Sequence, residues 1–262
     1  HARAAVTRID FSKAAAFPRV QAVLDLKLAR VRYAGEPLLA LAAESRQALD
    51  AALRLVEVEY EVQRHAATME LAMAEDAPPV HGNRPNVSEG RGRSDDESIT
   101  KAFETADAVV EATVTTQVQT HSSLETHACV AHWEGRNLTL YASTQATFAF
   151  RDQIASILDS AKIPYDSIKV IAPFVGGGFG SKFSPGYHGR AAVLLAHQAN
   201  RPVKVLLNRK QEHLDTGNRP STIQKMRLAV SKNGQLGAYR LETWGTPGIG
   251  RGAGCTNPMI YG

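Results

Sequence analysis

Residues 170–183, VIAPFVGGGFGSKF, place four glycines around one phenylalanine directly after an apolar run. Glycine is the usual residue where a backbone turns sharply or approaches a ligand closely. Consecutive glycines also present several backbone N–H groups on one side of a loop, which suits anionic or oxo ligands. The stretch predicts a strand followed by a loop that holds a polar ligand through its backbone, with Phe179 screening it from water. The alternative is a purely structural turn with Phe179 in the core.

The loop fits neither of the common phosphate-binding motifs. A P-loop requires GxxxxGK[ST], but Ser181 precedes Lys182 here and Phe183 replaces the residue that would bind Mg²⁺. A dinucleotide-binding turn requires GxGxxG, and the last glycine is missing whether the count starts at Gly176 or Gly178. The sequence therefore disfavours a nucleotide-binding enzyme.

The segments around the loop mix helical and strand periodicities without regular alternation. This pattern predicts the α+β (mixed α/β) class. Ser45 is expected to cap the helix over 46–55. Residues 62–104 are polar and rich in Pro, Gly and Ser, which favours a surface linker. Strands are expected over 37–43, 56–61, 106–120, 127–134, 137–143, 167–175, 203–207, 223–230 and 235–244, and further helices over 146–158 and 187–199.

The composition excludes several classes of protein. The 262 residues are 44% hydrophobic and 21% charged, as in ordinary soluble domains. The net charge of +4 is not gathered into a basic stripe with interleaved aromatics, so nucleic acid is not an expected partner. No apolar run approaches the ~18–20 residues that cross a membrane. Two cysteines, Cys129 and Cys255, make neither a disulfide framework nor an iron–sulfur site.

The segment GGGFGSK, residues 176–182, resembles the molybdopterin loop of the xanthine dehydrogenase and aldehyde oxidase family, the molybdenum hydroxylases. Further segments resemble that family in the family's order, so the resemblance covers nearly the whole chain. It implies a partial N-terminal hammerhead domain over 1–63, a linker over 64–104 and an incomplete first molybdopterin-binding domain over 105–262. The supporting segments are 33–61, 119–135, 142–158 and 201–220.

The resemblance assigns cofactor-binding roles to individual residues. Gln145 holds the place of the family glutamine that reaches an oxygen ligand of molybdenum, for which an amide N–H₂ is a suitable donor. The alternative is that Gln145 caps the helix after it. Gly178, Phe179 and Gly180 match the loop positions that approach the metal, with Phe179 shaping the pocket. Lys182 is expected either to neutralise cofactor charge or to be solvated.

Phe183 departs from the family's purine-oxidising members, which have a heterocycle-binding glutamate at this position. A phenyl ring cannot accept hydrogen bonds from a purine. Phe183 is therefore predicted to line the pocket for an aldehyde or an aromatic N-heterocycle, unless it faces the core.

The resemblance implies a molybdenum-dependent oxidoreductase that hydroxylates its substrate with water as the oxygen source. Electrons would leave through [2Fe–2S] clusters and FAD on partner subunits or domains, and the pterin could be the cytosine dinucleotide form. The family's catalytic glutamate matches no residue here, so the catalytic base is unknown and we expect a piece of a longer large subunit. The resemblance is also compatible with a homo-oligomer. The expected compartment is the cytoplasm, or the periplasm if a partner carries an export signal.

Two other functions stay open at this stage. The chain could be a non-catalytic interaction or assembly module that retains the fold. It could also be a zinc enzyme that uses His121, His127 and Cys129, because zinc prefers nitrogen and sulfur ligands. The spacing of these three residues matches no usual zinc motif.

Overall fold

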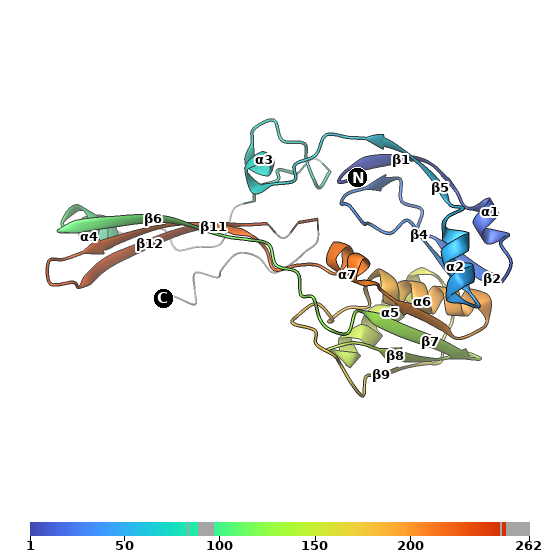
Figure 1. Ribbon diagram of the computed structural model, residues 1–262. Helices are drawn as coiled ribbons and strands as arrows, with labels where there is room; N and C mark the ends of the chain where they lie inside the picture. Colours follow the sequence, from blue (N-terminus) through green and yellow to red (C-terminus); the bar gives the residue numbers. More distant parts are fainter. Residues whose placement is uncertain (83, 89–96, 247, 250–262) are drawn as a thin grey trace. The chain divides into compact units, whose positions relative to one another are not determined.

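The computed structural model describes residues 1–82, 84–88, 97–246 and 248–249 (Figure 1). Its contacts divide the chain into two compact units. Unit 1 combines residues 1–64 with 121–217, and unit 2 combines 65–120 with 218–262. Helices and strands are mixed in each unit, which confirms the predicted α+β class. No helix among the described residues is long and apolar enough to cross a membrane.

Unit 1 contains the glycine loop and the N-terminal strands. Its first part comprises β1 (Ala4–Asp10), α1 (Ser12–Ala15), β2 (Val20–Asp25), β3 (Arg30–Val31), β4 (Leu39–Ala43), α2 (Arg46–Leu53) and β5 (Glu57–Val62). Its second part comprises β7 (Ala128–Glu134), β8 (Asn137–Ala142), α5 (Thr147–Ser160), β9 (Ser167–Ile171), α6 (Gly186–Ala199), β10 (Val203–Leu206) and α7 (Arg209–Asp215).

The sheet of the second part has the strand order β10-β7-β8-β9. The predicted strands β7 and β8 form an antiparallel hairpin, and β8 pairs in parallel with β9 because α5 connects them as a crossover. Burial alternates along β8, where Leu138 and Leu140 face the core. Phe150, Ile154 and Leu158 recur at helical spacing on α5 and pack against these leucines. Burying each such side chain stabilises the fold by about 1.5–3 kcal/mol. The glycine loop joins this sheet to α6 (Figure 1).

The N-terminal part of unit 1 forms two small sheets, β3-β1-β5 and β2-β4. The predicted strand–helix–strand order is confirmed, and Ser45 accepts a hydrogen bond from the Ala48 N–H as the predicted cap. β4 and β5 are nevertheless not neighbours, because β4 pairs with β2 and β5 with β1. Ala42 of β4 packs against Ala191 and Leu195 of α6, the helix that follows the glycine loop.

Unit 2 is built on the antiparallel sheet β12-β11-β6, in which the predicted strands β11 and β12 form a hairpin. Part of the stretch expected to be a linker is helical. Ile99 and Phe103 recur at helical spacing, and Phe103 lies beneath the guanidinium of Arg227. The division at residues 63 and 104 remains a prediction from the family resemblance. The unit comprises α3 (Met69–Met73), α4 (Glu97–Glu104), β6 (Ala108–Thr116), β11 (Thr222–Val230) and β12 (Leu236–Gly245).

β9 is shorter than the predicted strand over 167–175. It ends at Ile171, and Pro173, which has no N–H to donate to a sheet, follows it. The side chain of Phe174 is 87% exposed rather than buried in a strand. The early end of β9 leaves Pro173, Phe174 and Val175 as the lead-in to the glycine loop.

Candidate functional site

The glycine loop, residues 176–182, closes on itself through a tight turn from Gly178 to Ser181. The Ser181 N–H donates to the Gly178 carbonyl at 2.9 Å, and the central residues Phe179 and Gly180 have φ of 51° and 93°. Glycine adopts this conformation without strain, whereas a non-glycine residue there costs about 1–3 kcal/mol. The Phe179 ring is 72% exposed, so the alternative that it fills the core is wrong. Phe179 is thus strained without being buried.

Gln145 anchors the loop through its side-chain oxygen. Oε1 accepts from the N–H of Gly180 at 3.0 Å and from that of Lys182 at 3.3 Å. These donors fix the amide orientation, because an N–H₂ group in the same place could not accept from them. The alternative that Gln145 caps α5 is wrong, because the N-cap is Ala146 and no side chain caps that helix. Within the described ranges, Nε2 of Gln145 makes no hydrogen bond, and Gln145 is exposed.

The close approach of Gln145 explains the glycine at position 178. A Cβ atom on Gly178 would lie 2.3 Å from Oε1 of Gln145, which no real contact allows. The N–H groups of Gly177, Gly178 and Phe179 make no hydrogen bond to another described residue. The N–H of Gly180, by contrast, is already bound to Gln145. The loop therefore presents consecutive donors beside the Nε2 amide of Gln145.

Glu125 connects the two ends of the loop. Its Oε2 accepts from the Gly176 N–H at 2.7 Å, the Ser143 hydroxyl at 2.6 Å and the Lys182 ammonium at 3.1 Å. Burial raises the Glu125 pKa, but these bonds outweigh it and the net pKa is lowered. One of the two expectations for Lys182, that it is solvated, is wrong, because its side chain is fully buried.

Three further hydrogen bonds fix the carbonyl groups of Ser181 and Lys182 at the end of the loop. The Thr144 hydroxyl and the Gln145 N–H both donate to the Lys182 carbonyl at 2.9 Å. The buried ring of His127 bonds through Nε2 to the Ser181 carbonyl at 3.2 Å. Residues 143–145 and His127 therefore fix the loop before any ligand binds.

Phe183 lies just after the loop with 51% of its surface exposed. The alternative that it faces the core is therefore wrong. Phe174, before the loop, is also exposed. The predicted pocket residue is thus accessible to a ligand.

Two helices begin next to the site. α5 starts at Thr147, just after Gln145, and α6 starts at Gly186, shortly after Lys182. Helix N-termini carry partial positive charge and unpaired N–H groups, so they favour anions nearby. The field around the loop suits a negatively charged cofactor.

The structure does not favour the alternative of a zinc site. Cys129 lies in the apolar core between the sheet and its helices, and burial raises its pKa to about 12. Zinc binds the thiolate, which this environment disfavours. Among the described residues, no group of three or more His, Cys, Asp or Glu side chains could hold a metal ion. Cys255 lies outside the described residues.

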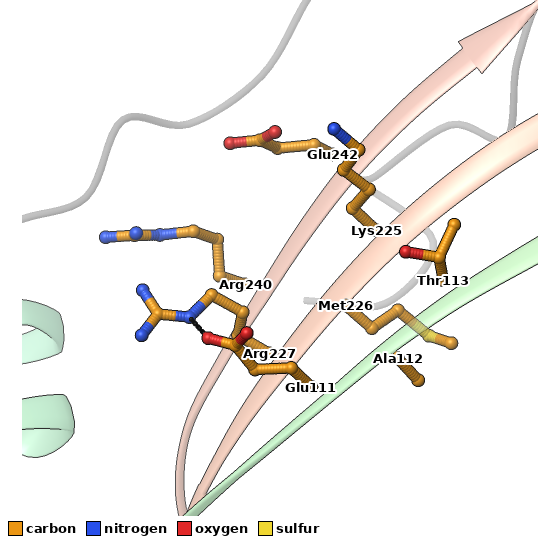
Figure 2. Close-up of a pocket in the computed structure, with 8 residues that line it drawn as sticks. All are labelled: Glu111, Ala112, Thr113, Lys225, Met226, Arg227, Arg240 and Glu242. Carbon is orange, nitrogen blue, oxygen red and sulfur yellow. Dashed lines mark hydrogen bonds and ion pairs between the residues drawn. The ribbon is translucent and has the colours of Figure 1, made fainter.

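A separate hollow of about 440 Å³ lies on the sheet of unit 2 (Figure 2). Both acidic and basic side chains line it, and Nε of Arg227 donates to Glu111 at 2.7 Å. None of the predicted site residues lines it. The hollow is therefore not the candidate cofactor site. Its lining residues are Glu111, Ala112, Thr113, Lys225, Met226, Arg227, Arg240 and Glu242.

Comparison with known proteins identifies the family of this chain. Residues 80–258 match the family model of the molybdopterin cofactor-binding domain. The chain belongs to the xanthine dehydrogenase and aldehyde oxidase family. This membership confirms the resemblance stated from the glycine loop and its flanking segments.

Molybdenum hydroxylase subunits are among the relatives. The chain is 33% identical over 203 residues to the aldehyde oxidoreductase molybdenum-binding subunit PaoC of Escherichia coli, covering 77% of this chain and 26% of that one. It is 29% identical over 268 residues to the nicotinate dehydrogenase large molybdopterin subunit of Eubacterium barkeri, covering 95% and 61% respectively. The chain therefore spans only part of the length of these relatives.

Solved structures of the family share the fold. CO dehydrogenase from Oligotropha carboxidovorans superposes with a TM-score of 0.81 at 27% identity, over 93% of this chain and 35% of that one. The aldehyde oxidoreductase from Desulfovibrio desulfuricans superposes with a TM-score of 0.82, but at 21% identity it supports the fold alone.

The geometry around the loop fits a molybdopterin. The residues predicted from the sequence, Gln145 and the loop, come together and leave N–H donors available. Sequence reasoning assigned no loop-holding role to Thr144, Ser143 and His127. Ser143 and Thr144 had a signal, because they directly precede Gln145.

Proposed function

We propose that this chain supplies the loop and the glutamine that hold molybdopterin in a molybdenum hydroxylase large subunit. The observation that carries the proposal is the orientation of Gln145. Its Oε1 is occupied by the loop's own N–H groups, so its Nε2 is directed away from them as a donor. The N–H groups of Gly177, Gly178 and Phe179 provide donors in the same loop.

Each of the predicted residues has a distinct part in this proposal. Gln145 donates from Nε2 to an electronegative atom of the cofactor, and Gly178 leaves space for Gln145. Phe179 offers its N–H and places its ring over the loop, where it limits the access of water. Gly180 acts indirectly, because its N–H holds Gln145 in place.

The proposed reaction is the oxidative hydroxylation of an aldehyde or an aromatic N-heterocycle. When bound, the molybdenum cofactor supplies the redox centre and activates water as the source of oxygen. The chain's own residues orient the cofactor and exclude solvent around it. No catalytic base is assigned to a residue of this chain.

Phe183 supports the proposed substrate class. Its exposed ring offers an apolar surface and no hydrogen-bond acceptor to a purine. An aldehyde with an apolar substituent, or an aromatic ring that stacks on Phe183, fits this chemistry.

The remaining assignments stay predictions from the family resemblance. They are the cytosine dinucleotide form of the pterin, partner subunits or domains with [2Fe–2S] clusters and FAD, a homo-oligomer, and a cytoplasmic or partner-exported location. The assembly-module alternative would keep the fold without the cofactor. The loop's available donors favour the cofactor-binding function over it.

The test uses the complete large subunit purified with the proteins that accompany it. Molybdenum is measured by mass spectrometry and released pterin by fluorescence, and mass spectrometry of the released cofactor determines its nucleotide. Molybdenum and pterin in near-equal amounts to the chain are expected. A folded complete subunit that lacks both would contradict the proposal and favour the assembly module.

A further inference from the structure

The Ser181 carbonyl is hydrogen-bonded to a buried histidine, His127, which directly precedes β7. His127 is 2% exposed, and its Nε2 lies 3.2 Å from that carbonyl oxygen. A carbonyl can only accept a hydrogen bond, so the proton must be on Nε2. The same Ser181 closes the turn by donating its N–H to Gly178 at 2.9 Å. The position of the Ser181 carbonyl is therefore coupled to that of the turn.

The other ring nitrogen of His127 has no such partner. Nδ1 faces Oε1 of Glu212 at 3.8 Å, too far for a hydrogen bond, and both atoms are buried without a partner among the described residues. The other oxygen of Glu212 accepts from Arg209 at 3.1 Å. A buried polar atom without a partner is unfavourable, and an apolar residue here would avoid that cost. The bond from Nε2 is what distinguishes a histidine from a leucine at this position.

The surroundings of His127 keep its ring neutral. Burial lowers its pKa, the bond to the Ser181 carbonyl and the charge of Glu212 raise it, and the ammonium of Lys182 lowers it again, so the net pKa is lowered. The edge of its ring packs against His188 with 5.3 Å between ring centroids. Burial lowers the pKa of His188 to about 3, so His188 is neutral as well. Neutral His127 with its proton on Nε2 is thus a fixed donor beneath the loop.

We propose that His127 is a positioning residue for the glycine loop, and that its Nε2–H sets the location of Ser181 and thereby of the donors at Gly178 and Phe179. The proposal deepens the proposed function, because positioning matters only if the loop holds a cofactor. No role in the chemical step is implied, since His127 lies beneath the loop and bonds to its backbone.

Two polar variants separate this role from simple filling of space. In His127→Gln the side-chain Nε2 can take the place of the imidazole Nε2 and donate to Ser181. In His127→Asn the amide reaches only the place of Nδ1, so the Ser181 carbonyl loses its donor. Both variants are polar and smaller than histidine, which makes them matched controls for each other.

The readout is hydrogen exchange, followed by mass spectrometry, of the peptide that contains the loop in the complete subunit with its accompanying proteins. Exchange in His127→Gln is expected to stay close to wild type, whereas in His127→Asn it becomes roughly tenfold faster, as expected for one lost buried hydrogen bond. Retained pterin per chain is expected to fall in the same order.

The outcomes distinguish this proposal from the proposed function. The positioning role would be overturned if the two variants behave alike. This includes exchange that matches wild type in both, exchange that is faster in both, and failure of both to fold. Wild-type protein without pterin would contradict the proposed function, but the exchange comparison would still decide whether Nε2 fixes the loop.

Discussion

The ammonium of Lys182 lies 2.8 Å from the main-chain oxygen of Glu125 and 3.1 Å from its carboxylate. Glu125 also accepts from the Gly176 N–H, so one residue fixes both ends of the glycine loop. The lysine is a fully buried residue that bonds to Glu125, whereas its place after a glycine loop favours either a cation near the cofactor or a solvated side chain. This arrangement makes the loop rigid before a cofactor is present.

Replacing Lys182 with methionine should destabilise unit 1. The change leaves the Glu125 carboxylate without its cation, and breaking a buried ion pair costs about 3–5 kcal/mol. Because the Glu125 side chain is 38% exposed, water offsets part of the loss, and we expect about 2–3 kcal/mol. Thermal denaturation of the complete subunit should show a lower midpoint than for Lys204→Met, an exposed control. Equal midpoints would show that the pair contributes nothing.

Replacing Gln145 with glutamate should separate anchoring from cofactor binding. A carboxylate oxygen can still accept from the N–H groups of Gly180 and Lys182, but the outward N–H₂ donor is lost. We expect an unchanged denaturation midpoint and kcat/KM lower by roughly 10²–10³, the usual effect of losing one preorganised donor. Steady-state kinetics on an aldehyde panel provides the measurement. Unaltered kinetics would mean that Nε2 does not contact the reacting system.

Replacing Phe179 with glycine should stabilise the fold while impairing function. The residue has φ of 51° and its ring is largely exposed, so glycine relieves about 1 kcal/mol of strain with little loss of burial. Lys162→Gly is the control, because Lys162 is exposed with φ of 55° but lies after α5. Both variants should denature at higher temperature, and only Phe179→Gly should lose activity. A loss of activity in neither variant would remove Phe179 from the site.

The stability of unit 1 should depend on pH through Asp215. The pKa of Asp215 is raised to about 6. Burial is the main cause and the charge of Glu36 adds to it, while a hydrogen bond from the Tyr33 hydroxyl lowers the pKa. The resulting stabilisation is complete below the unfolded pKa of 3.8 and is lost as pH rises through about 6. Asp215→Asn, which mimics the protonated form, should therefore stabilise the protein at pH 8 by about 1–3 kcal/mol and not at acidic pH.

The measurement compares denaturation midpoints of wild type and Asp215→Asn from acidic to alkaline pH. Asp159→Asn serves as the control, because Asp159 is exposed on α5. A constant difference between wild type and Asp215→Asn across this range would refute the linkage.

The sequence predicted the parts of the site that depend on local pattern. The glycines from 176 to 180 require a turn or close approach wherever they occur, and Ser45 has a local capping signal. The partners of Lys182 could not be predicted, because its bond to Glu125 joins residues distant in the sequence. The same limit applies to His127, whose contact with Ser181 depends on how the sheet packs beneath the loop.

Other errors have local causes. The helix over Glu97–Glu104 is short and follows a polar, Gly- and Ser-rich stretch, so its single apolar pair, Ile99 and Phe103, gives only a weak helical signal. The zinc alternative rested on histidine and cysteine side chains that lie close together in the sequence. In the fold, Cys129 packs into the apolar core, which only the placement of α5 and α6 determines.

The most direct test is a density map of the complete, cofactor-loaded large subunit that resolves the glycine loop. The account predicts that Nε2 of Gln145 and at least one N–H among Gly177, Gly178 and Phe179 lie about 2.7–3.2 Å from acceptor atoms of the cofactor. A cofactor bound elsewhere, with these donors facing only solvent or protein, would contradict the central claim.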